Sequence, residues 1–308
     1  MSFASDIKEE LVRIEPVCKH CNKATLSALV RIDGTIFLSG EGKYRVEIAT
    51  DFASVGRFIV NMLHSLYNLT TEISYRRSVL HHTQNYRIDL PYQKNIAFAL
   101  KDLGILENDN SLNNTISKRI IPNECCKISY LRGAFLGSGF IADPISNFHF
   151  ELSVSTEELA SDISSHMEEL DIKSRIVKRR NSWVVYMKSA KEINKFLTIV
   201  GAKNSLVTLQ DVLEYKLDRN NSNRFVNAFM ANQNRVTNAS YEQLACIHKI
   251  LMKKELQNIP PALKEFIKLR VENPDASLKE LGQMCDPPLS KSAINNRARR
   301  IKELSKED

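Results

Sequence analysis

Two apolar stretches, roughly 100 residues apart, follow the same pattern of small and large side chains. Leu26–Gly34 and Leu131–Gly139 both carry small residues at helical spacing and both end at a glycine. Each stretch is followed by a segment in which apolar and polar residues alternate, at Tyr44–Thr50 and Phe148–Val154. This alternation predicts half-exposed antiparallel strands. The chain therefore contains two related halves, and a repeat of this length indicates two domain-sized parts rather than a solenoid.

The pattern within each half predicts helix, two strands, helix, two strands, helix. We therefore expect an α+β fold class, with a duplicated αββαββα domain over residues 1–205 whose halves span about 1–105 and 122–205. Small residues on one face of each apolar stretch predict that the two helices pack closely together. After residue 205 the strand pattern ends. We expect a linker with a short docking helix at 206–239 and an all-α domain at 240–308, whose first helix is capped by Ser240.

The end of the chain predicts a helix-turn-helix. Ser277 and Glu280 form a capping-box pattern, and the turn DPPLS ends at Ser290, which caps a second helix rich in Lys, Asn and Arg. The start of such a helix reaches base edges, and residues further along hold phosphates. A basic helix end is also favoured by the helix dipole, but the capped helix before it favours DNA binding. The expected DNA contacts are Ser277, Ser290, Lys291, Ser292, Asn295, Asn296, Arg297, Arg299 and Arg300.

The composition agrees with a DNA partner. The 308 residues include 43 Lys and Arg against 36 Asp and Glu, a formal net charge of +7, which favours a polyanion. We find no apolar run that could span a bilayer and no signal-peptide pattern at the start of the chain. The sequence therefore predicts a cytoplasmic, nucleoid-associated protein that binds double-stranded DNA, without a membrane partner or a cofactor.

Further basic residues lie outside the helix-turn-helix. They occupy equivalent hairpins of the two halves and the Asn-rich linker, and two interpretations stay open. All of them are secondary DNA contacts, or the hairpin residues are charges that keep a sheet edge soluble and the linker is a hinge. These residues are Arg76, Arg77, Lys178, Arg179, Arg180 and Arg235.

Four of the six cysteines precede the two apolar stretches. Cys18 and Cys21 lie before the first stretch, and Cys125 and Cys126 lie before the second. If the two helices are neighbours, these thiols converge at the N-terminal ends, and four thiolates would suit zinc. A CxxC pair combined with an adjacent CC pair matches zinc-ribbon spacing poorly, however. We therefore expect these cysteines to pack as small hydrophobic residues and to bind no metal.

The two apolar helices, each at the head of an αββαββα half, resemble the motif helices of single-chain LAGLIDADG homing endonucleases. In that family the motif helices form the interface between the halves, and the sheets form a saddle on DNA. The penultimate motif residue is an acid that binds the catalytic divalent metals. Here that position is Asp33 in the first half and Ser138 in the second. The resemblance therefore implies a vestigial site without nuclease activity, and an endonuclease or nickase that uses Asp33 is the alternative.

The order of the parts resembles the WhiA family of bacterial DNA-binding regulators. The matching segments are CCKISYLRGAFLGSG, NQNRVTNAS and SLKELGQMCDPPLSKSAINNRARRIKEL. The resemblance implies a non-enzymatic transcriptional regulator of cell division and chromosome segregation, and of sporulation in some bacteria. A second alternative is a scaffold that docks a protein co-regulator. The sequence does not indicate the oligomeric state, the operator or the regulated genes.

Overall fold

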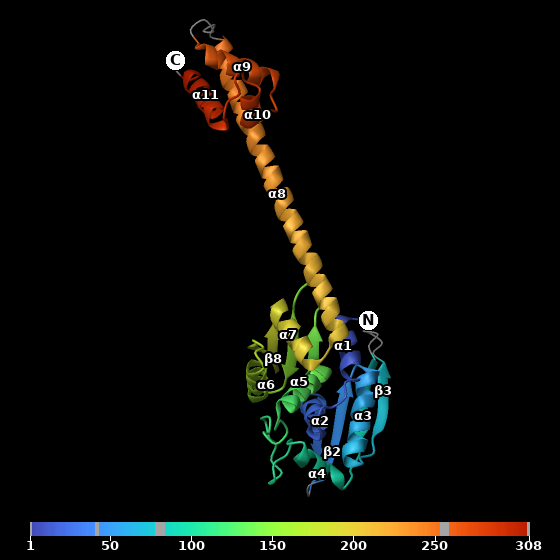
Figure 1. The fold of residues 1–308 in the computed structure, drawn as a ribbon. Coiled ribbons are helices and arrows are strands. Elements are labelled where there is room, and N and C mark those ends of the chain that lie inside the picture. Colours follow the sequence, from blue (N-terminus) through green and yellow to red (C-terminus); the bar gives the residue numbers. More distant parts are fainter. Residues whose placement is uncertain (1, 41–42, 78–83, 253–258, 307–308) are drawn as a thin grey trace. The chain divides into compact units, whose positions relative to one another are not determined.

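Helices and two β-sheets share the first part of the chain, whereas the second part is helical (Figure 1). The computed structural model describes residues 2–40, 43–77, 84–252 and 259–306. Its contacts divide the chain into two units, Met1–Tyr215 and Lys216–Asp308. The α+β fold class expected from the sequence is confirmed.

The two halves of the first unit repeat one arrangement of elements. Their sheets have the strand orders β1-β2-β4-β3 and β5-β6-β8-β7, with every neighbouring pair antiparallel. The first half contains α1 (Phe3–Leu11), α2 (Lys19–Asp33), β1 (Gly34–Leu38), β2 (Tyr44–Thr50), α3 (Ala53–Tyr67), β3 (Glu72–Arg77), β4 (Gln84–Leu90) and α4 (Asn95–Asp102). The second half contains α5 (Glu124–Ser138), β5 (Gly139–Ile141), β6 (Phe150–Val154), α6 (Glu157–Glu169), β7 (Arg175–Arg179), β8 (Ser182–Met187) and α7 (Ala190–Val200).

One face of each sheet is buried, as the alternation in the sequence predicts. In the first sheet Ile48 of β2 pairs with Ile88 of β4, and both side chains are fully buried. In the second sheet Leu152 of β6 pairs with Val185 of β8, and both are likewise buried. Helices α3 and α6 pack on these strands. The opposite face of each sheet carries the intervening polar residues.

The two halves meet where α2 packs against α5, between the two sheets (Figure 1). The helices approach so closely that a Cβ atom at Gly133 would lie 2.4 Å from the Thr25 carbonyl oxygen and 3.0 Å from the Ala28 Cβ. The Thr25 hydroxyl donates to the Ser129 carbonyl across this crossing, at 3.0 Å. The close helix packing predicted from the small residues is therefore confirmed.

The second unit is built around the end of α8 (Lys203–Met252), with α9 (Pro261–Glu272), α10 (Leu278–Gln283) and α11 (Lys291–Leu304). Phe266, Leu281, Ile294 and Ile301 are fully buried in its core, together with Ile247 of α8. Among the described residues no helix combines the length and the apolar character needed to cross a membrane.

The segment expected to be a linker with a short docking helix instead lies within the single helix α8, which begins in the first unit and ends in the second. This segment contains neither glycine nor proline, so no residue type that breaks helices interrupts it. Its apolar residue Phe225 is 74% exposed rather than docked. Ser240 does not begin a helix, because it lies inside α8 and its hydroxyl donates to the Pro274 carbonyl.

Replacement of Gly133 by alanine should destabilise the first unit, because the added methyl group meets the backbone of α2. Overpacking of this kind typically costs about 1–3 kcal/mol. Urea unfolding of the full chain, followed by the fluorescence of Trp183, measures the effect. Trp183 is the only tryptophan and packs against the core of the first unit.

Gly56→Ala in α3 is the matched control. A Cβ atom at Gly56 meets no atom closer than 3.6 Å, so alanine should be neutral or stabilising by up to about 1 kcal/mol. Equal effects of the two substitutions would contradict the close approach of α2 and α5.

Candidate nucleic-acid interface

Helices α10 and α11 are joined by a turn, and the N-terminus of each helix is capped as the sequence predicts. The Ser277 amide donates to the Glu280 carboxylate at 2.7 Å, and the Glu280 amide donates to the Ser277 hydroxyl at 3.3 Å. Ser290 caps α11 by accepting from the Ala293 amide at 3.2 Å. Across the turn between the two helices, the Leu289 amide donates to the Gly282 carbonyl at 2.8 Å. The expected capping box and helix-turn-helix geometry are confirmed.

One face of α11 is buried and the opposite face is exposed. Ile294, Ala298 and Ile301 pack into the core of the second unit. The residues left exposed at the start and along the outer face are Ser290, Lys291, Ser292, Asn295, Asn296, Arg299 and Arg300. They are neutral polar or cationic, which suits base edges and phosphates.

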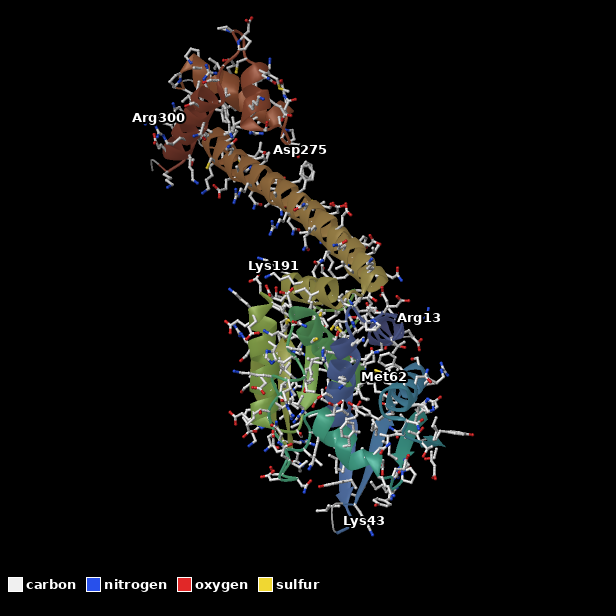
Figure 2. The ribbon with its side chains drawn as sticks, turned by 60° about the horizontal axis from the view of Figure 1, so that its bottom comes forward. Arg13, Lys43, Met62, Lys191, Asp275 and Arg300 are labelled. Atoms are coloured by element: carbon white, nitrogen blue, oxygen red, sulfur yellow. The ribbon has the colours of Figure 1, made fainter. Side chains whose placement is uncertain are left out.

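Arg299 and Arg300 place their charges at the solvent-exposed surface. Their side chains are 72% and 58% exposed, and Figure 2 shows Arg300 at the surface of the second unit. Each lies near the Glu303 carboxylate, at 3.8 Å and 3.0 Å. Exposed pairs at this spacing contribute little to stability, so both guanidinium groups are free to exchange Glu303 for a phosphate.

The sequence predicts that the Arg297 side chain faces outward, but in the structure it turns toward α9. Its guanidinium lies 2.8 Å from the Glu265 carboxylate of α9, and its side chain is only 19% exposed. The position explains the contact, because residue 297 lies three residues after Ile294 and four before Ile301, at the edge of the buried stripe. In this structure Arg297 therefore joins α11 to α9 within the domain.

Arg270 organises the loop before α10 and is a residue that the sequence reasoning missed. Its side chain is 1% exposed, and burial lowers the pKa of its guanidinium. It donates to the Ala276 carbonyl at 2.6 Å and to the Gln243 side chain of α8 at 2.9 Å. Its spacing from Phe266 and Ile267, four and three residues earlier, places it on the buried face of α9 and was the available signal.

The two positions that correspond to the LAGLIDADG motif acids lie at the C-terminal ends of α2 and α5. The two halves contribute different groups there: Asp33 supplies a carboxyl, whereas the Ser138 hydroxyl accepts from the Ser153 amide at 3.1 Å. Burial raises the pKa of Asp33 to about 7, although the Lys8 charge opposes this shift. The Lys8 ammonium is itself buried and donates to the Gly137 carbonyl at 2.9 Å. A lysine thus lies close to the one retained acid.

The open faces of the sheets carry acids as well as bases. Arg45 lies 2.6 Å from Asp89, and Arg87 pairs with Glu47. On the second sheet Arg179, expected as a DNA contact, holds Glu151 with two hydrogen bonds of 2.9 and 2.5 Å. These bases are therefore already neutralised by carboxylates on the same face.

The other basic residues predicted outside α11 are scattered. Lys178 lies over the Trp183 ring at 5.4 Å, and Arg180 forms the β7–β8 turn with a positive φ of 45°. Arg235 is exposed on α8. Arg76 and Arg77 end β3, and their side chains lie outside the described residues.

The four cysteines converge, as expected if α2 and α5 are neighbours. Their sulfur atoms all lie within 4.8 Å of one another, at the N-terminal ends of these two helices. The cysteines could hold a metal ion. The described residues contain no second group of three or more His, Cys, Asp or Glu side chains with such ligand geometry.

Three family models match the chain in succession. They are the WhiA N-terminal LAGLIDADG-like domain over residues 19–106, the WhiA LAGLIDADG-like domain over residues 127–217 and the WhiA C-terminal HTH domain over residues 222–305. A relative from Thermoanaerobacter sp. (strain X514), named probable cell division protein WhiA, is 40% identical over 310 residues, which cover 99% of this chain and 98% of the relative. The chain belongs to the WhiA family.

Other members of the family match this chain over nearly its whole length. The probable cell division protein WhiA of Alkaliphilus metalliredigens is 35% identical over 99% of this chain and 98% of its own. The crystal structure of full-length WhiA from Thermatoga maritima shares the fold, with a TM-score of 0.60 and 23% identity over 99% of this chain and 98% of that one. The WhiA resemblance drawn from the sequence motifs is thus confirmed.

The raised pKa of the half-buried Asp33 should make the stability of this WhiA-family domain depend on pH. Between about pH 4 and pH 7 the folded state keeps a proton that an unfolded aspartate, with a pKa of about 3.9, has lost. Stability should therefore fall as pH rises through this window, by up to about 1.4 kcal/mol per pH unit. Asp33→Asn should remove this slope in urea unfolding followed by Trp183 fluorescence.

Ser138→Ala is the control for the pH experiment, because serine does not titrate. It should change the free energy of unfolding by a constant amount at every pH. If wild type and Asp33→Asn gave parallel curves from pH 4 to pH 7, the pKa of the Asp33 carboxyl would not be raised in the folded state.

Proposed function

We propose that this chain binds double-stranded DNA sequence-specifically and acts as a transcriptional regulator of cell division and chromosome segregation, and of sporulation in bacteria that sporulate. The observation that carries this proposal is the exposed, cationic and amide-rich face at the start of α11, held by a capped turn after α10. The names of the relatives, probable cell division protein WhiA, support a role in cell division. Association with the cytoplasmic nucleoid follows from the proposed DNA binding.

Within this interface the residues have different roles. Asn295 and Asn296 have amide groups that can pair with adenine, and Lys291 suits guanine. Arg299 and Arg300 lie further along the helix and hold phosphates. Ser277 and Ser290 use their hydroxyls as helix caps, so they fix the position of the helices beside the DNA.

The same reasoning supports a protein without nuclease activity. Mg²⁺ needs several oxygen ligands, and a two-strand cleavage site needs carboxylates from both motif helices. This chain offers the half-buried Asp33 on one side, the uncharged Ser138 on the other, and the Lys8 cation close by. A half-buried acid with a raised pKa beside a lysine is a poor ligand for a divalent metal.

Asn296→Ala and Arg300→Ala should affect DNA binding in different ways. Loss of the Asn296 amide should weaken binding to the preferred site by about 1–3 kcal/mol and leave random DNA almost unchanged. Loss of Arg300 should weaken both and reduce the slope of log K against log salt concentration by about one. Fluorescence anisotropy with both duplexes, over a range of salt concentrations, measures each effect.

Arg13→Ala is the matched charge control. Arg13 lies just after α1, is labelled in Figure 2, and its side chain is 80% exposed. It pairs with Glu9 four residues earlier, much as Arg299 pairs with Glu303. This variant should bind both duplexes like the wild type. If Arg13→Ala and Arg300→Ala weakened binding equally, α11 would be part of a diffuse electrostatic surface and not a recognition helix.

Incubation of the full chain with supercoiled plasmid and Mg²⁺ should leave the plasmid intact, since only one of the two acids is present. Gel electrophoresis at equimolar and excess protein, with Asp33→Ala in parallel, measures this. Nicked or linear product that disappears in the Asp33→Ala sample would favour the nickase alternative and contradict the proposal.

A further inference from the structure

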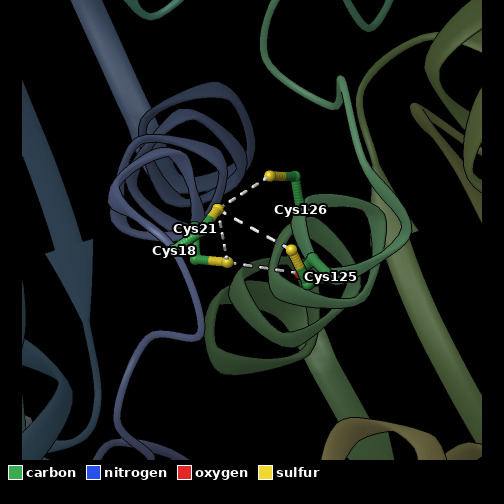
Figure 3. A group of neighbouring side chains, drawn as sticks. All are labelled: Cys18, Cys21, Cys125 and Cys126. Atoms are coloured by element: carbon green, nitrogen blue, oxygen red, sulfur yellow. Dashed lines mark hydrogen bonds between the residues drawn. The ribbon is translucent and has the colours of Figure 1, made fainter.

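Four cysteines meet at the start of the two central helices of the first unit (Figure 3). Cys18 is the N-cap residue of α2 and Cys21 lies in its first turn, whereas Cys125 and Cys126 lie in the first turn of α5. The sulfur of Cys18 lies 3.4 Å from that of Cys21, 3.5 Å from that of Cys126 and 3.7 Å from that of Cys125. Cys21 and Cys126 are buried.

We propose that these four cysteines bind one Zn²⁺ ion as a structural tetrathiolate site that joins the two halves of the first unit. A tetrahedral ion with Zn–S bonds of about 2.3 Å separates its sulfur ligands by about 3.8 Å. The sulfur atoms here are separated by 3.4 Å to at most 4.8 Å, which brackets that value. This proposal reverses the expectation from the spacing of the cysteines, since the ligands converge through the packing of α2 on α5.

The sulfur–sulfur distances favour a single bound ion over a disulfide, an iron–sulfur cluster or simple side-chain packing. The separations exceed the S–S bond of about 2.05 Å, and a disulfide would use only two of the four groups. An iron–sulfur cluster places several irons and bridging sulfides between its ligands, and so needs thiols further apart than a single ion does. Simple packing of small side chains does not require four sulfur atoms to point at one centre.

Without an ion, burial raises the pKa of the Cys125 and Cys126 thiols, so four thiolates need the positive charge of a bound cation and the help of their surroundings. All four residues lie at helix N-termini, where the helix dipole and free amide groups stabilise anions. The buried guanidinium of Arg132 interacts electrostatically with Cys21. A bound ion would also close a chain segment of roughly 100 residues between the two cysteine pairs, and closure of a long loop gives the larger stabilisation.

The direct test is metal analysis of the full chain after removal of metal by a chelator under reducing conditions and reconstitution with Zn²⁺ alone. Mass spectrometry of the metal should give about one zinc per chain, and the reconstituted protein should unfold several degrees higher than the metal-free protein. Reconstitution with Co²⁺ should give the intense absorption bands of tetrahedral cobalt thiolate. This spectrum tests the site in the wild type, without any variant that fails to fold.

The double variant Cys18→Ser, Cys125→Ser removes one partly exposed ligand from each half. It should weaken zinc binding by at least about 100-fold, because loss of a direct ligand costs more than loss of a residue that only contacts a ligand. Cys246→Ser, on α8 and outside the cluster, is the matched control and should bind zinc like the wild type. Each of three results would overturn the proposal: no zinc after reconstitution, equal zinc in the double variant and the wild type, or iron with acid-labile sulfide in the purified protein.

Discussion

The close approach of α2 and α5 is the constraint on which the first unit depends. At the crossing, Gly133 leaves no room for a side chain against the Thr25 backbone, so the two helices act as one central element. Each helix then continues at its C-terminal end into the first strand of its sheet. The crossing therefore fixes both sheets and also determines which side chains gather at the two ends of the helix pair.

These two ends carry different chemistry. At the N-terminal ends the helix dipoles point toward four thiols, an arrangement suited to anions and to a cation that binds them. At the C-terminal ends lie Asp33, Ser138 and the Lys8 ammonium, which donates to a backbone carbonyl of α5. In the LAGLIDADG arrangement this second end is the catalytic one. Here Asp33, Ser138 and Lys8 occupy it, while carboxylates pair with arginines on the open faces of the sheets.

Local patterns in the sequence were sufficient to predict the helices and strands of the first unit and the turn between α10 and α11, but not the continuous helix α8, where a linker was expected. The strand alternation, the duplicated helix and the caps at Ser277 and Ser290 depend on residues within a few positions of one another, so they are readable without the structure. The contacts that were missed depend on tertiary packing. Arg297 meets Glu265 and Arg270 meets Gln243 only after α9 has packed on α8 and α11. The convergence of the cysteines, from positions more than 100 residues apart, was predicted only on the condition that α2 and α5 are neighbours, and their packing fulfils that condition.

The central claim is that DNA is read by α10 and α11 of the second unit and not by the sheets of the first. Photo-crosslinking of the full chain to a duplex chosen by in vitro selection, followed by mass spectrometry of the crosslinked peptides, tests it most directly. The account predicts that the crosslinks fall in the turn after α10 and the first half of α11, around residues 284–300. Crosslinks concentrated in the strands of the two sheets, with none in α11, would contradict it.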